Sequence, residues 1–203
     1  MNTPDPTDAE PQPAATPAMR TRPLVESPAL AAKAVQFLSE GPSGFRMSQD
    51  EAQRVVAYMR WVSYAPQSFL YREGDSTRTS YMLMVLEGDV SVDTAASGRA
   101  DRVAISVLGP GALIGEMALL DGAPRSTSCT AITPVQAAGM SQGGLAALAD
   151  EHPAVAFKLM TFMARSTANR LRALGEQLHM YDQVIADLHQ EIDQLRAAKE
   201  GRY

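Results

Sequence analysis

Apolar residues at helical spacing predict two helices within residues 28–62. In the first, the apolar face consists of Leu30, Ala34, Phe37 and Leu38. Ser27-Pro28 is typical of a helix start, and Gly41-Pro42 is typical of a helix end. The second helix is expected to begin at Ser48, because Glu51 follows at the spacing of a capping box. Its expected apolar stripe consists of Val55, Val56, Met59 and Val62.

The apolar period then changes from helical to two, which predicts antiparallel strands. The apolar runs are 68–72, 80–86, 89–93, 102–108, 126–132 and 134–139. In the 80–86 run, both sets of alternating residues are apolar, so this strand is expected to be covered on both faces. The sets are Tyr81, Leu83 and Val85 against Met82, Met84 and Leu86. We therefore expect an α+β fold, with an antiparallel β-roll or jelly-roll sandwich over residues 63–140.

From residue 141 the pattern is helical again, with a break at His152-Pro153 and then no further proline. A hinge helix and a long C-terminal helix are therefore expected within residues 141–200. Apolar residues alternate at spacings of three and four, the pattern of a coiled-coil seam. The seam consists of Leu171, Leu174, Leu178, Tyr181, Ile185, Leu188, Ile192 and Leu195. We expect a parallel homodimer; the alternative is an amphipathic helix lying on its own domain.

Composition limits the class of protein. The 203 residues suffice for one main domain with appendages. Residues 1–27 are rich in Pro, Ala, Thr and acidic residues without an apolar period, so a disordered tail is expected there. The net charge of −5 gives no general attraction for nucleic acid. No apolar stretch has the length of a membrane span, and the N-terminus lacks the apolar centre of a signal peptide, so a cytoplasmic protein is expected.

Candidate chemistry is sparse outside one segment. Cys129 is the single cysteine, and with three scattered histidines it makes no metal-ligand cluster. We therefore expect Cys129 to be a small buried apolar residue and expect no metal or cofactor. No arrangement of base and nucleophile indicates catalysis, so the protein is not expected to be an enzyme.

The segment GEMALLDGAPRST, residues 115–127, carries the candidate chemistry. If Gly115 permits a tight turn and a helix begins at Glu116, the free amides of Met117 and Ala118 would form an anion site. Arg125 lies beyond the Asp121–Pro124 turn, from which its planar guanidinium could meet two phosphate oxygens. Glu116 would accept hydrogen bonds from ribose hydroxyls. The segment therefore predicts a sugar-phosphate ligand, with further hydroxyls from Ser126 and Thr127.

This segment resembles the phosphate-binding cassette of the cyclic nucleotide-binding domain family, with the cassette spanning residues 111–127. FLYREGD (69–75) and YMLMVLEGDVSV (81–92) resemble the first strands of that family. The short helix followed by a long one is similar to the hinge and capping helices of catabolite activator protein-like transcription factors. The resemblance covers residues 45–178. It implies a cyclic nucleotide receptor with this family's β-roll.

The resemblance also implies roles for single residues. Gly115 would permit the tight turn, and Glu116 would hold the ribose 2′-hydroxyl. The amides of Met117 and Ala118, together with Arg125, would bind the cyclic phosphate. Ser126 would contact phosphate or base, and Ser rather than Thr directly after the Arg favours cyclic AMP over cyclic GMP. In the capping helix, the residues placed near the base are Arg170, Leu171 and Leu174.

Two departures from the family shape the expectation. Leu174 and Gly175 occupy the place where the transcription factors present Thr-Ser hydroxyls to adenine, which leaves cyclic AMP, cyclic GMP and cyclic dinucleotides open. The sequence also shows no counterpart of the helix-turn-helix, so we expect a stand-alone domain that signals to a protein partner without direct DNA binding. The alternatives are an interaction scaffold with a vestigial pocket and a DNA-associated regulator acting through a partner.

Overall fold

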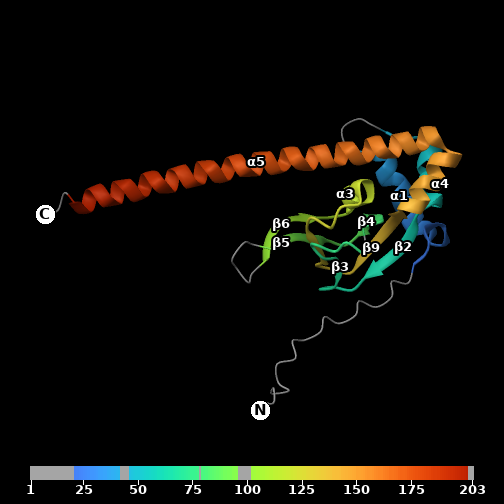
Figure 1. The fold of residues 1–203 in the computed structure, drawn as a ribbon, viewed down its shortest axis with the longest axis horizontal. Helices are drawn as coiled ribbons and strands as arrows, with labels where there is room; N and C mark the ends of the chain where they lie inside the picture. The colour runs from blue at the N-terminus through green and yellow to red at the C-terminus, as the bar shows by residue number, and fades with distance from the viewer. Residues whose placement is uncertain (1–20, 42–45, 78, 96–101, 201–203) are drawn as a thin grey trace, which may run out of the picture.

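The computed structural model describes residues 21–41, 46–77, 79–95 and 102–200, and it combines antiparallel strands with a long C-terminal helix (Figure 1). The helices are η1 (Leu24–Glu26), α1 (Pro28–Glu40), α2 (Gln49–Ala57), α3 (Glu116–Asp121), α4 (Gln142–Glu151) and α5 (Pro153–Glu200). The strands are β1 (Arg22–Pro23), β2 (Arg60–Tyr64), β3 (Phe69–Tyr71), β4 (Tyr81–Glu87), β5 (Val90–Ala95), β6 (Arg102–Leu108), β7 (Leu113–Ile114), β8 (Ser128–Ala131) and β9 (Val135–Ser141). The expected α+β class and β-roll are confirmed.

The strands form two antiparallel sheets. One has the order β1-β2-β9-β4-β7 and the other the order β3-β8-β5-β6. Strand β4 lies inside the first sheet, paired with β9 on one edge and with β7 on the other. The tight turn between β4 and β5 requires glycine, because Gly88 has a φ of 83° and a Cβ there would lie 2.3 Å from the Pro134 carbonyl oxygen.

Two apolar cores share β4 as their common wall. Met82, Met84 and Leu86 pack into the core between the first sheet and the helices, while Leu83 and Val85 pack into the core between the two sheets. The alternation predicted for this strand is therefore confirmed. Because β4 is covered on both faces, it fixes the first sheet between a helical layer and a second sheet, and its partner strand β7 lies within the cassette.

The N-terminal helices confirm most of the expected pattern. Helix α1 buries Leu30, Ala34 and Leu38, with Phe37 partly buried against the same core. Ser27 does precede α1, but its side chain makes no capping hydrogen bond. For α2 the capping box is complete, because the Ser48 hydroxyl accepts from the Glu51 amide at 3.2 Å and the Glu51 carboxylate accepts from the Ser48 amide at 2.9 Å.

Two expected boundaries are wrong. Helix α2 ends at Ala57, and Val62 lies on β2, where it pairs with Ala137 of β9. The expected tail is also too long, since residues 22–26 form β1 and η1 and bury Leu24 completely. The Leu24 amide donates to the Met59 carbonyl at 3.0 Å, so pairing with a distant segment orders this stretch. Residues 1–20 of the expected tail lie outside the described part.

Helix α5 has two parts with different surroundings. Its first turns bury Val155, Ala156, Leu159, Phe162 and Met163 against the helical core, as an amphipathic helix on its own domain would. Its C-terminal half extends past the strands (Figure 1). From Leu171 onward, six residues of the predicted seam are exposed by 43% to 70%. They are Leu171, Leu178, Tyr181, Ile185, Leu188 and Ile192, while Leu174 is half-buried and the side chain of Leu195 lies outside the described part. No helix in the described ranges combines the length and the apolar character needed to cross a membrane.

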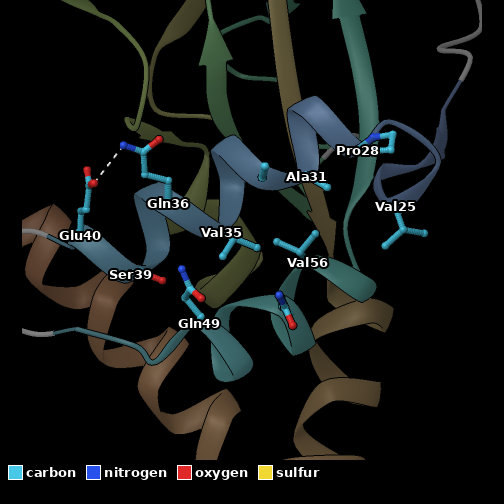
Figure 2. A pocket seen from close by; sticks show the side chains of 11 residues that line it. Val25, Pro28, Ala31, Val35, Gln36, Ser39, Glu40, Gln49 and Val56 are labelled. Atoms are coloured by element: carbon cyan, nitrogen blue, oxygen red, sulfur yellow. Dashed lines mark hydrogen bonds between the residues drawn. The ribbon is translucent and has the colours of Figure 1, made fainter.

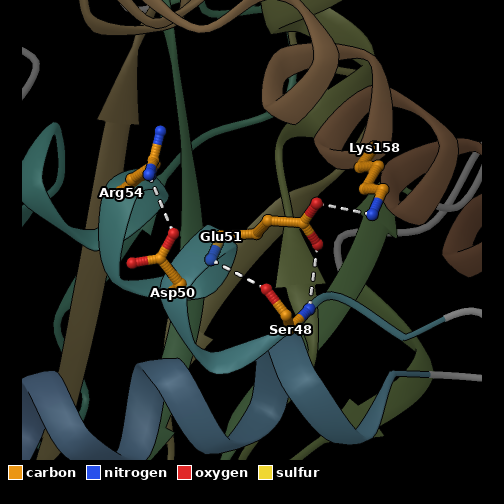
Figure 3. A network of polar contacts seen from close by, with 5 residues as sticks. All are labelled: Ser48, Asp50, Glu51, Arg54 and Lys158. Carbon is orange, nitrogen blue, oxygen red and sulfur yellow. Dashed lines mark hydrogen bonds and ion pairs between the residues drawn. The ribbon is translucent and has the colours of Figure 1, made fainter.

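One polar network connects α2 to α5 (Figure 3). The Lys158 ammonium on α5 donates to the Glu51 carboxylate at 2.6 Å, while the same carboxylate closes the capping box. The hydrogen bond from Lys158 and the bond from the Ser48 amide lower the pKa of Glu51. A carboxyl group with a lowered pKa in the folded state stabilises the fold above its unfolded pKa, and this contribution disappears as the pH falls through the folded pKa.

Replacing Glu51 by glutamine is expected to lower the free energy of unfolding at neutral pH by no more than about 1 kcal/mol, because the ion pair is partly exposed. Glutamine retains the capping-box acceptor, so the change isolates the contact with Lys158. Urea unfolding at pH ~7 and pH ~3 would measure it, and the difference from wild type should be smaller at the lower pH. Glu26→Gln, an exposed carboxylate outside this network, is the control. Equal differences at both pH values would contradict the assignment.

Candidate functional site

The GEMALLDGAPRST segment of the cassette begins at Gly115, in the left-handed region with a φ of 75°. A Cβ at this position would lie 2.3 Å from Nη1 of Arg125, so both the backbone and the neighbouring side chain require glycine. Helix α3 follows at once, and the amides of Met117 and Ala118 lie in its first turn. It ends at Asp121 and is capped by Gly122, which is also left-handed with a φ of 68°. The expected tight turn and short helix are therefore present.

Arg125 folds back from the turn after α3 into the body of the roll. Its side chain is buried, with the residue only 2% exposed. Nη1 donates to the Gly115 carbonyl and Nη2 to the Tyr81 carbonyl, both at 2.8 Å. The guanidinium carbon lies 4.4 Å from the ring centroid of Tyr71 and 4.7 Å from that of Tyr81. These contacts hold the planar guanidinium in one orientation at the base of the cassette.

Glu116 is the second buried charged residue of the cassette, 1% exposed. Its Oε1 accepts a hydrogen bond from the Thr167 hydroxyl at 3.2 Å and forms an ion pair with Nη1 of Arg170 at 3.1 Å. Arg170 also donates through Nη2 to the Leu113 carbonyl. Both Thr167 and Arg170 belong to α5, so the long helix is attached directly to the first residue of α3.

Between these groups lies a pocket of about 240 Å³. Its lining contains every cassette residue predicted to contact ligand, together with Arg170 from α5. The lining residues are Tyr71, Gly115, Glu116, Met117, Ala118, Asp121, Ala123, Pro124, Arg125, Ser126, Thr127 and Arg170. Leu171 and Leu174, which were also expected near the base, are not among them, and Leu171 is 70% exposed. Of the three residues predicted on the capping helix, only Arg170 lines the pocket.

The sequence analysis assigned no site role to Tyr71, Tyr81 and Thr167. The two tyrosines stand in the strand segments that resemble the family, yet their position beside Arg125 depends on the packing of β3 against β4. Tyr71 also contacts Cys129, and burial raises the pKa of Tyr71 and raises that of Cys129 to about 11. Cys129 is fully buried and therefore stays a neutral thiol at neutral pH, which confirms its expected packing role.

A larger hollow of about 560 Å³ lies between η1, α1 and α2 (Figure 2). Apolar side chains, including Ala31, Val35 and Val56, form much of its wall. Glu40, hydrogen-bonded to Gln36 at 2.9 Å, is the charged side chain among the described residues that line it. A phosphate would have no cationic partner there, so the smaller pocket is the better candidate for a sugar-phosphate ligand. In the part of the chain that the structure describes, no cluster of His, Cys, Asp and Glu could hold a metal ion.

Comparison with known proteins agrees with this geometry. Residues 61–152 match the family described as "Cyclic nucleotide-binding domain". The "Cyclic AMP receptor protein" of Thermus thermophilus is 29% identical over 134 residues, which cover 66% of this chain and 59% of that protein. The chain therefore spans less than two thirds of the length of this relative.

Two solved structures extend the similarity to the fold. A cyclic nucleotide-binding domain from Methylobacillus flagellatus superimposes with a TM-score of 0.68 at 26% identity, covering 73% of this chain and 82% of that one. The N-terminal domain of a transcriptional regulator from Streptomyces coelicolor is 31% identical with a TM-score of 0.55, covering 68% of this chain and 93% of that one.

Proposed function

The chain carries a domain of the cyclic nucleotide-binding family, and we propose that it is a non-enzymatic, cytoplasmic receptor for a cyclic mononucleotide. The ligand binds in the pocket around Arg125, and the signal passes through a dimeric α5 to a protein partner. The observation that carries this proposal is the pair of buried charged residues, Glu116 and Arg125, that line one small pocket. Charged side chains are rarely buried without a specific role.

The chemistry of the pocket suits a cyclic sugar phosphate. The Arg125 guanidinium pairs with the phosphate oxygens, supported by the amides of Met117 and Ala118. Glu116 accepts from the ribose 2′-hydroxyl. The exposed Ser126 and the half-buried Thr127 line the same pocket and supply hydroxyl groups to phosphate or base. Cyclic AMP is the favoured ligand, because Ser follows Arg125 and because the Thermus relative is named a cyclic AMP receptor.

Glu116 provides the route from the pocket to α5. This carboxylate accepts hydrogen bonds from Thr167 and Arg170. A ribose hydroxyl that binds Glu116 shares or replaces these contacts, so the bound and free states favour different positions of α5. Thr167 lies four residues before Leu171 and so continues the three-four spacing of the seam. Ligand-dependent contacts and dimer contacts therefore meet on the same turns of one helix.

The seam on α5 supports dimerisation. Its large apolar residues are exposed in the monomer, and Phe157 and Met160, exposed by 71% and 41%, continue its spacing toward the N-terminus of α5. An apolar stripe of this length on one helix is typical of a surface that is covered in the assembled protein. A parallel homodimer would cover it.

A thermal-shift panel of cyclic mononucleotides and dinucleotides on the purified protein tests the proposal. Cyclic AMP at a hundredfold excess over its dissociation constant is expected to add about 2.7 kcal/mol to the free energy of unfolding by mass action. Cyclic GMP and cyclic dinucleotides should give smaller shifts at the same concentration. Adenosine 5′-monophosphate is the control for the cyclic phosphate. Lack of a shift with every ligand would favour the interaction scaffold with a vestigial pocket.

The DNA-associated alternative makes a different prediction about gel retardation. Binding through phosphate contacts would weaken as salt concentration rises. We expect no retardation of DNA by the protein alone, with or without cyclic AMP, because residues 173–192 on the exposed part of α5 contain acidic residues but no Lys or Arg.

A further inference from the structure

A second stripe of side chains runs along the exposed half of α5. We call it the acidic ridge, and it consists of Glu176, Met180, Val184, Asp187 and Glu191. The spacings of four, four, three and four place all five within an arc of about 80° at the helical rotation of about 100° per residue. All five residues are exposed, with Met180 at 60% and Val184 at 55%.

The acidic ridge is separate from the dimer seam. At the same rotation per residue, its centre lies about 120° around the helix from the centre of the seam. A two-stranded coiled coil covers the seam positions and leaves Glu176, Met180 and Asp187 in solvent, whereas Val184 and Glu191 directly precede Ile185 and Ile192 and so flank the seam. After dimerisation Met180 would stay exposed and Val184 would lie at the edge of the interface, so the dimer would carry one ridge on each helix.

The order of side chains along the ridge defines the chemistry of its partner. Two apolar residues stand at its centre, with Glu176 before them and Asp187 and Glu191 after them. These carboxylates would repel the phosphates of nucleic acid and of anionic lipid. A second copy of the ridge in a symmetric contact would bring carboxylates against carboxylates. A partner surface with apolar residues between basic ones would complement the two central apolar residues and the flanking carboxylates of the ridge.

We propose that the acidic ridge is the docking surface for an amphipathic helix of a partner protein, one that carries two apolar side chains flanked by Lys or Arg. The apolar side chains pack on Met180 and Val184, and the basic side chains pair with Glu176, Asp187 and Glu191. This proposal deepens the proposed function and rests on it, because only a dimer that occupies the seam leaves the ridge as the exposed apolar surface of distal α5.

The test uses the full chain and a fluorescein-labelled helical peptide of about 20 residues as a probe, long enough for appreciable helix content. Its two leucines and its lysines repeat the spacing of the ridge on an alanine background, and a second peptide has glutamate at each lysine. Fluorescence anisotropy is expected to show binding of the lysine peptide, weakened about tenfold by Met180→Gln with Val184→Gln, because these changes remove the two apolar contacts at the centre of the ridge. Glu176→Lys with Glu191→Lys should reverse the preference toward the glutamate peptide.

Ala186→Gln with His189→Gln changes the other side of α5 and is the matched control, expected to leave binding unchanged. Equal binding of the two peptides, or an equal loss in this control, would overturn the proposal. So would a wild-type tetramer that becomes a dimer in the Met180→Gln, Val184→Gln variant, since a second dimer would then cover the ridge.

Cyclic AMP binding and dimer mass are measured on the same variants, which separates the two proposals. A dimer that binds cyclic AMP but takes up the lysine peptide independently of Met180 and Val184 would refute the docking surface alone. Peptide binding that is lost on changing Ile185 and Leu188 to lysine, but not on changing the ridge, would place the peptide in the seam and overturn both the docking surface and the dimer.

Discussion

Arg125→Ala is expected to lower the affinity for cyclic AMP by at least about a hundredfold, measured by isothermal titration calorimetry. The guanidinium is the cationic group that the cassette places in the pocket, and each charge-assisted hydrogen bond to phosphate contributes about 1.5–3 kcal/mol. Two such bonds correspond to a factor of about a hundred or more in the dissociation constant. Adenosine, which lacks the cyclic phosphate, should bind weakly and equally to both proteins.

Two further variants show whether this loss comes from binding or from folding. Arg125 also donates to the Gly115 and Tyr81 carbonyls, so alanine is expected to lower the free energy of unfolding by about 1–3 kcal/mol. Arg125→Lys keeps the charge but not the bidentate geometry, and it should bind with intermediate affinity. Arg172→Ala, on the exposed side of α5, should bind as wild type does. A folded Arg125→Ala protein with wild-type affinity would refute the assigned site.

Ile185→Lys combined with Leu188→Lys is expected to weaken dimerisation by at least about a hundredfold. Each apolar side chain contributes about 1.5–3 kcal/mol when buried, and both helices of a dimer lose two of them. The new ammonium groups also repel each other across the seam. Sedimentation equilibrium would show a monomer at concentrations where the wild type is dimeric.

Gln183→Lys with Gln190→Lys adds the same charge to α5 on the face away from the seam, and this control should remain dimeric. Cyclic AMP binding by the monomeric variant is also informative. If the pocket is complete within one chain, as the lining suggests, affinity should persist when the dimer is lost. An unchanged mass for the seam variant would show that α5 dimerises through another face or not at all.

The elements that could be predicted correctly from the sequence are those whose structure is set by residues close together in the chain. Strand β4 was predictable because both of its alternating sets are apolar, and the start of α2 because Ser48 and Glu51 stand at capping-box spacing. The end of α2 was not predictable in this way. Met59 and Val62 fit a helical stripe at i and i+3, and only the pairing of β2 with β9 makes Val62 a strand residue. Leu24 was missed because the Leu24-Val25 pair between two prolines has no period.

In the candidate site, too, features set by local spacing were predictable from the sequence, whereas contacts between distant segments were not. Gly115, Glu116 and Arg125 could be found from their spacing, because the cassette is a continuous segment whose turns are set by glycine. The contacts of Glu116 with Thr167 and Arg170 lie more than 50 residues away in sequence. They depend on where a 48-residue helix crosses the roll, which no local pattern encodes. The burial of Arg125 between two tyrosines is likewise a product of tertiary packing.

Glu116 belongs both to the pocket and to the contact with α5. The affinity of the pocket for nucleotide therefore depends on what holds α5 in place. Coupling between two binding sites is reciprocal, so a molecule that holds α5 in one position changes nucleotide affinity by the same factor as the nucleotide changes the affinity for that molecule. The partner at the acidic ridge would therefore adjust the cyclic nucleotide concentration at which the receptor responds. Two cells with the same receptor and different amounts of partner would answer the same rise in nucleotide at different thresholds.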